Sequence, residues 1–164
     1  MPISGDDYRQ LGRVSAGAIS VVAAYDHERA AIIALTVSSF VTLSFEPPLV
    51  MFAIQHDTAS YASMVTSKAF GVSLLGTEQS DVARLFANQG REQARQTSFD
   101  SGPQLQVPLV PGALAQIECR THEIFMSGDH AIVVGMVEGA QTRQGQPLLY
   151  FARQYGGFTP LAGA

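Results

Sequence analysis

The chain has 164 residues, of which 46% are apolar and 15% are charged. This composition predicts one compact domain over residues 1–164 with a full hydrophobic core, and it excludes a disordered chain. The net charge of −4 and the ten Lys and Arg residues, scattered without a basic run, argue against a nucleic-acid-binding protein. Because so few residues are charged, we expect part of the surface to be covered in a homodimer.

The N-terminus lacks the features of a secretion signal. It has neither a basic region nor an apolar one, and no apolar run approaches the ~20 residues that a membrane helix needs. The single cysteine, Cys119, cannot form an intramolecular disulfide. We therefore expect a cytoplasmic protein that does not enter a membrane.

The N-terminal half of the chain alternates between short helical and strand patterns. Two acids precede a helix over residues 6–14, in which Tyr8, Leu11 and Val14 share one face. A second short helix is predicted over residues 60–67. The β-branched or continuously apolar runs predict strands over residues 18–24, 30–37, 49–54 and 70–75. We expect the 49–54 strand to be buried on both faces, and a loop over residues 39–48 that a Pro pair closes.

The second half begins with the most regular helical pattern, over residues 78–89, with Thr77 as its expected N-cap. Residues 90–106 are polar and without period, which indicates a loop that frames a site. The remaining strand predictions are residues 109–114, 115–121 with 124–125, 130–140 and 148–152. Short strands with turn signals and few helices predict a mostly β fold, a closed or nearly closed antiparallel barrel.

Small hydroxyl residues cluster in the segment 34–48. Thr36, Ser38, Ser39, Thr42 and Ser44 lie on a run of β-branched and aromatic residues. Hydroxyls and backbone N–H groups at a strand end can bind a phosphate or a polyhydroxy chain without a positive charge. The simpler interpretation is that hydroxyls suit strand edges and turns.

Two further segments carry candidate site residues. The polar run 55–60 follows an apolar strand and enters a helix, which is the arrangement of an anion site, although it also describes an ordinary capped turn. Gly128, Asp129 and His130 precede a strand, and an imidazole there can donate to a carboxamide or a phosphate oxygen.

In their order and separations, these segments resemble the short-chain flavin reductase family, which includes the reductase partners of two-component flavin monooxygenases. The resemblance extends from Tyr8 to Tyr155 and includes the C-terminal run that begins with Pro147. It implies an FMN-binding split β-barrel with flavin held at a dimer interface. It also implies an NAD(P)H:flavin oxidoreductase that reduces FMN or FAD with NADH or NADPH, and that supplies reduced flavin to a monooxygenase.

The resemblance assigns a cofactor-binding role to residues in five segments. They are Thr36, Val37, Ser38, Ser39 and Ser44; Gln55, His56, Thr58 and Ser60; Phe86 and Ala87; Gly128, Asp129 and His130; and Tyr155. Within this set, His130 is expected to orient the nicotinamide rather than to transfer a proton, because hydride transfer depends mainly on stacking of two rings. Phe86 also fits the apolar stripe of its helix, which favours a core position.

Three positions depart from the family pattern. Ala34 stands where glycine is usual, His56 replaces a lysine and its permanent charge, and Leu85 replaces an arginine. These departures keep open a flavin-binding split-barrel protein without reductase activity, or a reductase-like subunit that holds flavin tightly.

Other chemistries lack their usual motifs. The four His residues and Cys119 show no metal-ligand spacing, so no metal is expected. The chain has no G-x-G-x-x-G for a dinucleotide-binding βαβ unit and no G-x-S-x-G for a serine hydrolase.

Overall fold

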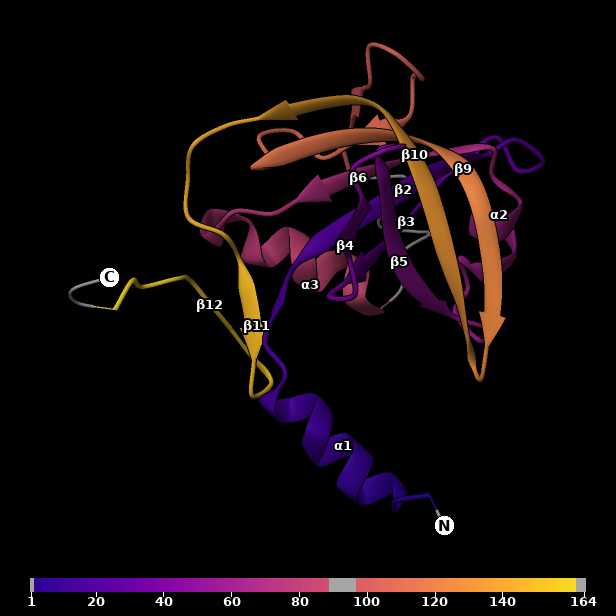
Figure 1. Cartoon of the computed structure of the whole chain (residues 1–164). Coiled ribbons are helices and arrows are strands. Elements are labelled where there is room, and N and C mark those ends of the chain that lie inside the picture. Colours follow the sequence, from indigo (N-terminus) through magenta and orange to yellow (C-terminus); the bar gives the residue numbers. More distant parts are fainter. Residues whose placement is uncertain (1, 89–96, 162–164) are drawn as a thin grey trace.

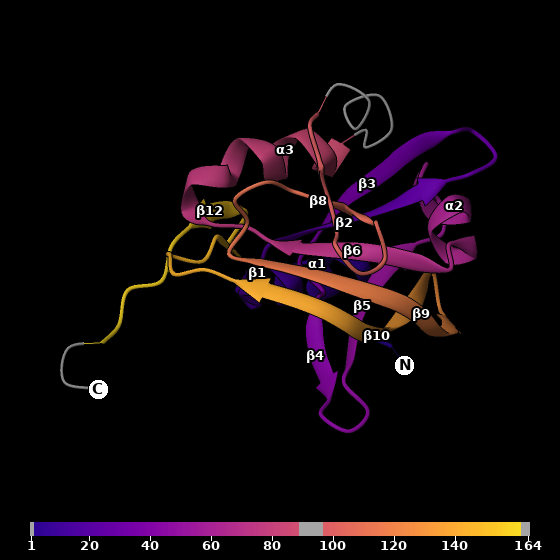
Figure 2. The ribbon, with the colours of Figure 1, turned by 90° about the horizontal axis from the view of Figure 1, so that it is seen from above.

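The computed structural model describes residues 2–88 and 97–161. Its main element is a seven-stranded antiparallel sheet with the strand order β3-β2-β6-β9-β10-β5-β4, curled around a shared core (Figures 1 and 2). The strands are β2 (Ser20–Asp26), β3 (Ala31–Val37), β4 (Val41–Ser44), β5 (Leu49–Gln55), β6 (Ala69–Leu74), β9 (Ala115–Ser127) and β10 (His130–Thr142). The prediction of a mostly β, antiparallel fold is confirmed.

Two small sheets accompany the large one. The first joins β1 (Gly17–Ala18), β11 (Leu149–Phe151) and β12 (Gln154–Gly156), and the second pairs β7 (Asp100–Ser101) with β8 (Pro108–Leu109). The core of the large sheet draws side chains from six of its strands: Val22, Leu35, Phe52, Phe70, Cys119 and Val133. Because successive residues of a strand face opposite sides, each strand contributes alternate side chains to this core.

The first helix, α1 (Gly5–Val14), begins at Ser4, whose hydroxyl accepts a hydrogen bond from the Asp7 N–H. The predicted apolar face is present but uncovered, since Tyr8, Leu11 and Val14 are 57–69% exposed. Figure 1 shows α1 projecting away from the sheet. Within the described residues, no helix is long and apolar enough to cross a membrane.

The helix predicted over residues 78–89 begins differently from the prediction. A short 3-10 turn, η1 (Thr77–Gln79), precedes α3 (Ser80–Asn88), and residue 89 lies outside the described part of the chain. Thr77 is not the N-cap, because that position belongs to Gly76, whose N–H donates to the Gln79 side chain at 3.1 Å. The other predicted helix is α2 (Tyr61–Thr66), which buries Ser63 and Met64.

Two predictions around the Pro pair were wrong. Part of the expected loop is the strand β4, which pairs with β5 through Val41 and Met51. The β5 strand alternates between buried and half-buried residues instead of being buried on both faces. β5 lies between β10 and β4, and an antiparallel sheet can pack one face on the core and leave the other partly open, so β5 buries only alternate side chains.

The hairpin of β9 and β10 is longer than predicted, because β9 continues through residues 122–123 without a break. Register shifts at Val134/Gly135 and Val137/Gly139 let both strands bend around the core. Gly135 lies where an added Cβ would come within 2.5 Å of the Phe70 ring, so only glycine fits there. The 90–106 loop prediction is described from residue 97 onward, and β7 falls within it.

Candidate functional site

Two predicted segments that are about 70 positions apart in the sequence meet at one end of the large sheet. His130 begins β10 directly opposite Gln55, the last residue of β5. One residue further, the His56 N–H donates to the Asp129 carbonyl oxygen at 3.0 Å. Gly128 makes the tight turn before them with a φ of 60°, a conformation that suits glycine. The structure therefore joins the 55–60 turn and the Gly128–His130 motif in one site.

The carboxylate of Asp129 orients the imidazole of His130. Its Oδ1 lies 2.7 Å from His130 Nδ1, and this hydrogen bond holds the pKa of Asp129 below its usual value. Because an ionised carboxylate only accepts, Nδ1 carries the proton. This leaves Nε2 of the partly exposed His130 ring as the atom that can contact a ligand.

Much of the hydrogen-bonding capacity of the 55–60 turn is already used. The Thr58 N–H and hydroxyl both donate to the Gln55 carbonyl oxygen, at 3.2 and 2.5 Å. Ser60 is buried and makes no capping hydrogen bond with its side chain. These hydrogen bonds fix the shape of the turn, and they use the Thr58 N–H and the hydroxyl proton of Thr58.

The His56 ring lies against the Tyr61 ring, with 4.9 Å between centroids. Its buried Nε2 has no hydrogen-bond partner among the described residues. A buried polar atom left unpaired costs free energy, and a ligand bound at this turn would remove that cost. The orphaned nitrogen is thus one feature of this end of the sheet that fits a bound polar group.

Ser39 connects the hydroxyl-rich segment to the same strands. Its Oγ accepts from the Ala53 N–H at 2.9 Å and donates to the Ala53 carbonyl oxygen at 3.2 Å. Ala53 in turn pairs with Ile132 of β10, so Ser39 lies two residues from the level of Gln55 and His130. Ser38 is exposed beside it. Ser38 and Ser39 therefore join the first group of site residues.

The other residues of the hydroxyl-rich segment point elsewhere. The Thr36 hydroxyl donates to the Ala83 carbonyl oxygen of α3 at 2.8 Å, and the Val37 side chain lies in the core. Ser44 pairs with Leu49, at the opposite end of β5 from Gln55, which for a strand of this length is a distance of roughly 20 Å. The structure does not bring Ser44 to the turn.

A second group of site residues lies around α3 and the C-terminal hairpin. The half-buried Tyr155 ring is 5.3 Å from the Tyr150 ring, and burial raises the pKa of its hydroxyl. The Arg84 guanidinium lies 5.3 Å from the Tyr155 ring centroid, within range of a cation–π interaction. Arg84 had no predicted role, and no sequence pattern places it over a residue 71 positions away.

The two remaining predicted residues differ in accessibility. Phe86 is 2% exposed and packs in a core cluster, with its ring 5.8 Å from Phe99. Its neighbour Ala87 is exposed. Phe86 thus occupies the core position that the apolar stripe of its helix favoured, and its side chain is not accessible to a ligand.

The segment that begins in β3 contacts elements of both groups. Thr36 contacts α3 and Ser39 contacts β5, and three residues span at most about 10 Å. Together the exposed parts offer hydroxyls, an amide, an oriented imidazole and an aromatic ring. Those donors fit a flavin, whose ring edge and ribityl chain take hydrogen bonds and whose faces take aromatic contacts.

Comparisons with known proteins identify the family of this chain. The family model described as a flavin reductase like domain matches residues 11–159. The chain is 36% identical over 146 residues to the reductase component of 4-hydroxyphenylacetate 3-monooxygenase from Thermus thermophilus, covering 88% of this chain and 90% of that protein. It is 32% identical over 129 residues to FMN reductase (NADH) SmoA from Agrobacterium fabrum, covering 77% and 72%.

The fold agrees as well. The styrene monooxygenase flavin reductase from Pseudomonas putida S12 superposes with a TM-score of 0.82 at 31% identity, covering 93% of this chain and 97% of that one. This likeness confirms the predicted split-barrel architecture. With its family model matched over nearly its whole length, the chain belongs to the flavin reductase family.

Proposed function

We propose that this protein is an NAD(P)H:flavin oxidoreductase that reduces FMN or FAD and passes the reduced flavin to a partner monooxygenase. The observation that carries the proposal is the meeting of Gln55, His56 and His130 at one end of β5 and β10. Family membership supports it, because relatives are named as an NADH-dependent FMN reductase and as a monooxygenase reductase component.

Each accessible residue has a role in this proposal. Ser38 and the backbone beside it hold the flavin, and the turn from Gln55 to Ser60 faces its phosphate, with Thr58 shaping that turn. A flavin bound there would supply the hydride acceptor. His130 donates from Nε2 to the nicotinamide when its ring is protonated, or accepts from the carboxamide N–H when it is neutral. Asp129 holds the ring in the same orientation in both protonation states.

Tyr155 belongs to the second group of residues, around α3 and the C-terminal hairpin. Its ring, held by Tyr150 and Arg84, offers a flat face for a flavin or nicotinamide ring. Ring stacking brings donor and acceptor atoms into contact and excludes water, which is what hydride transfer requires. No residue of the chain needs to act as an acid or base in that step.

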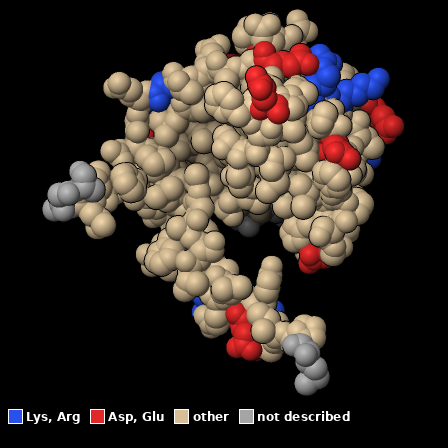
Figure 3. All heavy atoms as spheres, in the orientation of Figure 1, with Lys and Arg blue, Asp and Glu red and all other residues tan. Residues whose placement is uncertain are grey.

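We also propose that the protein works as a homodimer in the cytoplasm. Two exposed apolar surfaces need covering: Leu11 and its neighbours on α1, and the β4 edge, where Val41 is 46%, Leu43 48% and Phe45 98% exposed. In Figure 3, the broad central face between the sheet and α1 shows almost no charged atoms. Large uncharged apolar surfaces of this kind mark protein interfaces.

The test of the activity is NADH and NADPH oxidation by the purified protein, with and without FMN or FAD. We expect oxidation of at least one nucleotide that depends on flavin, supplied or retained. Flavin binding without oxidation of either nucleotide would support instead a flavin-binding protein without reductase activity.

The test of the dimer is sedimentation velocity at micromolar concentration. We expect a dimer mass, and a shift to monomer when Leu11→Glu places a charge on the exposed face of α1. A monomer with full activity would refute the dimer and leave the activity untouched.

A further inference from the structure

A large hollow lies on the other side of α2 from His56 and Tyr61. It has a volume of about 1110 Å³, and its walls are the tip of the β2–β3 hairpin, the face of α2 that begins at Ala62, and the segment 101–107. None of the predicted site residues lines it. Its size is that of a ligand site rather than a packing defect.

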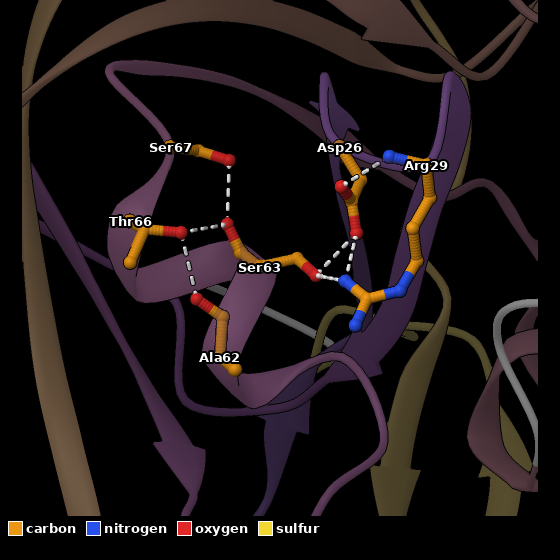
Figure 4. A network of polar contacts seen from close by, with 6 residues as sticks. All are labelled: Asp26, Arg29, Ala62, Ser63, Thr66 and Ser67. Atoms are coloured by element: carbon orange, nitrogen blue, oxygen red, sulfur yellow. Dashed lines mark hydrogen bonds and ion pairs between the residues drawn. The ribbon is translucent and has the colours of Figure 1, made fainter.

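The wall between the hairpin and α2 is held by a buried carboxylate. Asp26 is 6% exposed, and it accepts from the Arg29 N–H at 3.0 Å, from Arg29 Nη1 at 2.7 Å and from the Ser63 hydroxyl at 2.6 Å. Figure 4 shows these groups directed at one another across the gap between hairpin and helix. The hydrogen bonds from Ser63 and Arg29 hold the pKa of Asp26 far below its usual value.

This network fixes Arg29 in the wall of the hollow and leaves part of its guanidinium group accessible. The side chain is 50% exposed, and within the described residues Nη1 is the guanidinium atom that makes its contacts. A planar guanidinium held on one edge presents a flat face and further donors to the hollow.

The third wall is also held in place. Glu118 is 2% exposed, and its carboxylate accepts from the backbone N–H of Gln104 at 3.1 Å and of Leu105 at 2.6 Å. These bonds shape the segment that places Leu105 and Val107 in the wall. Two buried carboxylates therefore position opposite sides of the hollow.

A path of small exposed side chains joins the hollow to the proposed flavin site. Ala59, at the end of the turn, and Ala62 and Thr66 of α2 are exposed, and the i,i+4 spacing of Ala62 and Thr66 puts these two on one face of the helix. One helical turn, roughly 5 Å, separates the 55–60 turn from the hollow along this face. If the phosphate of a ligand lies at that turn, the group attached to the far side of the phosphate can extend into the hollow.

We propose that the hollow binds the adenosine half of a dinucleotide, FAD or NADH. This inference rests on the proposed function, because a phosphate at the 55–60 turn is what directs the adenosine here. Arg29 and the 40% exposed Tyr25 offer flat faces for a base, and Glu28 offers acceptors for ribose hydroxyls.

The charges of the lining are nearly balanced, which suits a nucleoside better than a free anion. Asp26 is paired with Arg29, Glu28 and Lys68 carry opposite charges, and His27 lies beside Tyr25 with 6.4 Å between ring centroids. Lys68, the one lysine of the sequence, forms no ion pair within residues 2–88 and 97–161. It is the cation left to face a phosphate oxygen.

The experiment compares the binding of each dinucleotide with that of its mononucleotide, in the wild type and in two variants. Ala62→Trp fills the path to the hollow. Gln144→Trp is the matched control, at an exposed position outside the hollow. Affinities for FAD and FMN are measured by fluorescence titration. KM values for NADH and reduced nicotinamide mononucleotide are measured with FMN as acceptor. Lys68→Ala is a milder second variant.

We expect Ala62→Trp to weaken one dinucleotide by about 10-fold, as the loss of one favourable subsite would, with its mononucleotide within about twofold of wild type. Loss confined to FAD assigns the hollow to flavin, and a KM increase confined to NADH assigns it to the nicotinamide nucleotide. Lys68→Ala should act on the same dinucleotide, by roughly threefold.

Unchanged dinucleotide binding in both variants would overturn the proposal, as would equal losses for dinucleotide and mononucleotide. Failure of the proposed function is separate from this. If the wild type oxidises no nicotinamide nucleotide with any flavin, the activity is refuted, while the comparison of FAD with FMN still tests the hollow.

Discussion

Ser39→Ala should destabilise the protein, because the Ser39 hydroxyl completes the hydrogen bonding of β5. The hydroxyl satisfies both backbone groups of Ala53, accepting from its N–H at 2.9 Å and donating to its carbonyl oxygen at 3.2 Å. The β4 strand begins two residues after Ser39, so no backbone of β4 replaces these contacts. Alanine removes both and leaves two polar groups of a half-buried residue unpaired.

The magnitude follows from those two contacts. Each is worth about 0.5–1.5 kcal/mol net, so the expected loss in the free energy of unfolding is about 2 kcal/mol. For a chain of this size, this corresponds to a Tm lower by roughly 4–8 °C. Urea unfolding of the flavin-free protein gives the free energy directly, and a calorimetric scan gives Tm.

Ser38→Ala is the matched control, since Ser38 is an exposed neighbour with no hydrogen bond from its hydroxyl to the described residues. We expect its stability within about 0.5 kcal/mol of wild type and its flavin affinity lower by about 2- to 10-fold, the worth of one hydrogen bond. Equal stability of the two variants would refute the structural role of the Ser39 hydroxyl. Unchanged flavin affinity in Ser38→Ala would remove Ser38 from the site.

Three further predictions concern single groups. Hydrogen bonds from Ser63 and Arg29 lower the pKa of Asp26 in the folded protein. The stability that this carboxylate confers is therefore complete above about pH 4, its unfolded pKa, and is lost as the pH falls towards the folded pKa. In urea unfolding between pH 3 and pH 6, the free energy of unfolding should fall less steeply with acid in Asp26→Asn than in the wild type. His130→Ala should raise the KM for NAD(P)H more than it lowers kcat in steady-state assays, whereas a collapsed kcat with unchanged KM would show a role in chemistry. Burial raises the pKa of Cys119 to about 12, so a thiol reagent at pH 8 should modify it only after unfolding, and rapid modification of the native protein would contradict its position in the core.

Local patterns in the sequence were enough to predict most elements of the fold. Alternation and β-branched runs predicted the strands that became β2, β3, β6 and β10, and the acids before Tyr8 predicted the start of α1. These signals are local, because each depends on residues a few positions apart. The order of the site motifs along the chain was likewise enough to identify the family.

Contacts between distant segments were decided only by the tertiary structure. Whether residues 41–44 form a strand depends on the neighbouring β5, and whether the apolar face of α1 is buried depends on what packs against it. The same holds for the site: the sequence predicted that Ser39, His56 and His130 act together, but their meeting depends on the pairing of β5 with β10.

The hollow beside α2 is the clearest example of a feature that local sequence patterns do not predict. Asp26, Arg29 and Ser63 carry no motif, and no local pattern marks them as a group. A hydrogen bond across 37 positions joins Ser63 to Asp26, and a cavity exists only where distant segments meet without filling the space between them. The sequence alone determines which residues can form strands, turns and hydrogen bonds, but the folded chain decides which of them face one another, because non-local packing energy exceeds local preference.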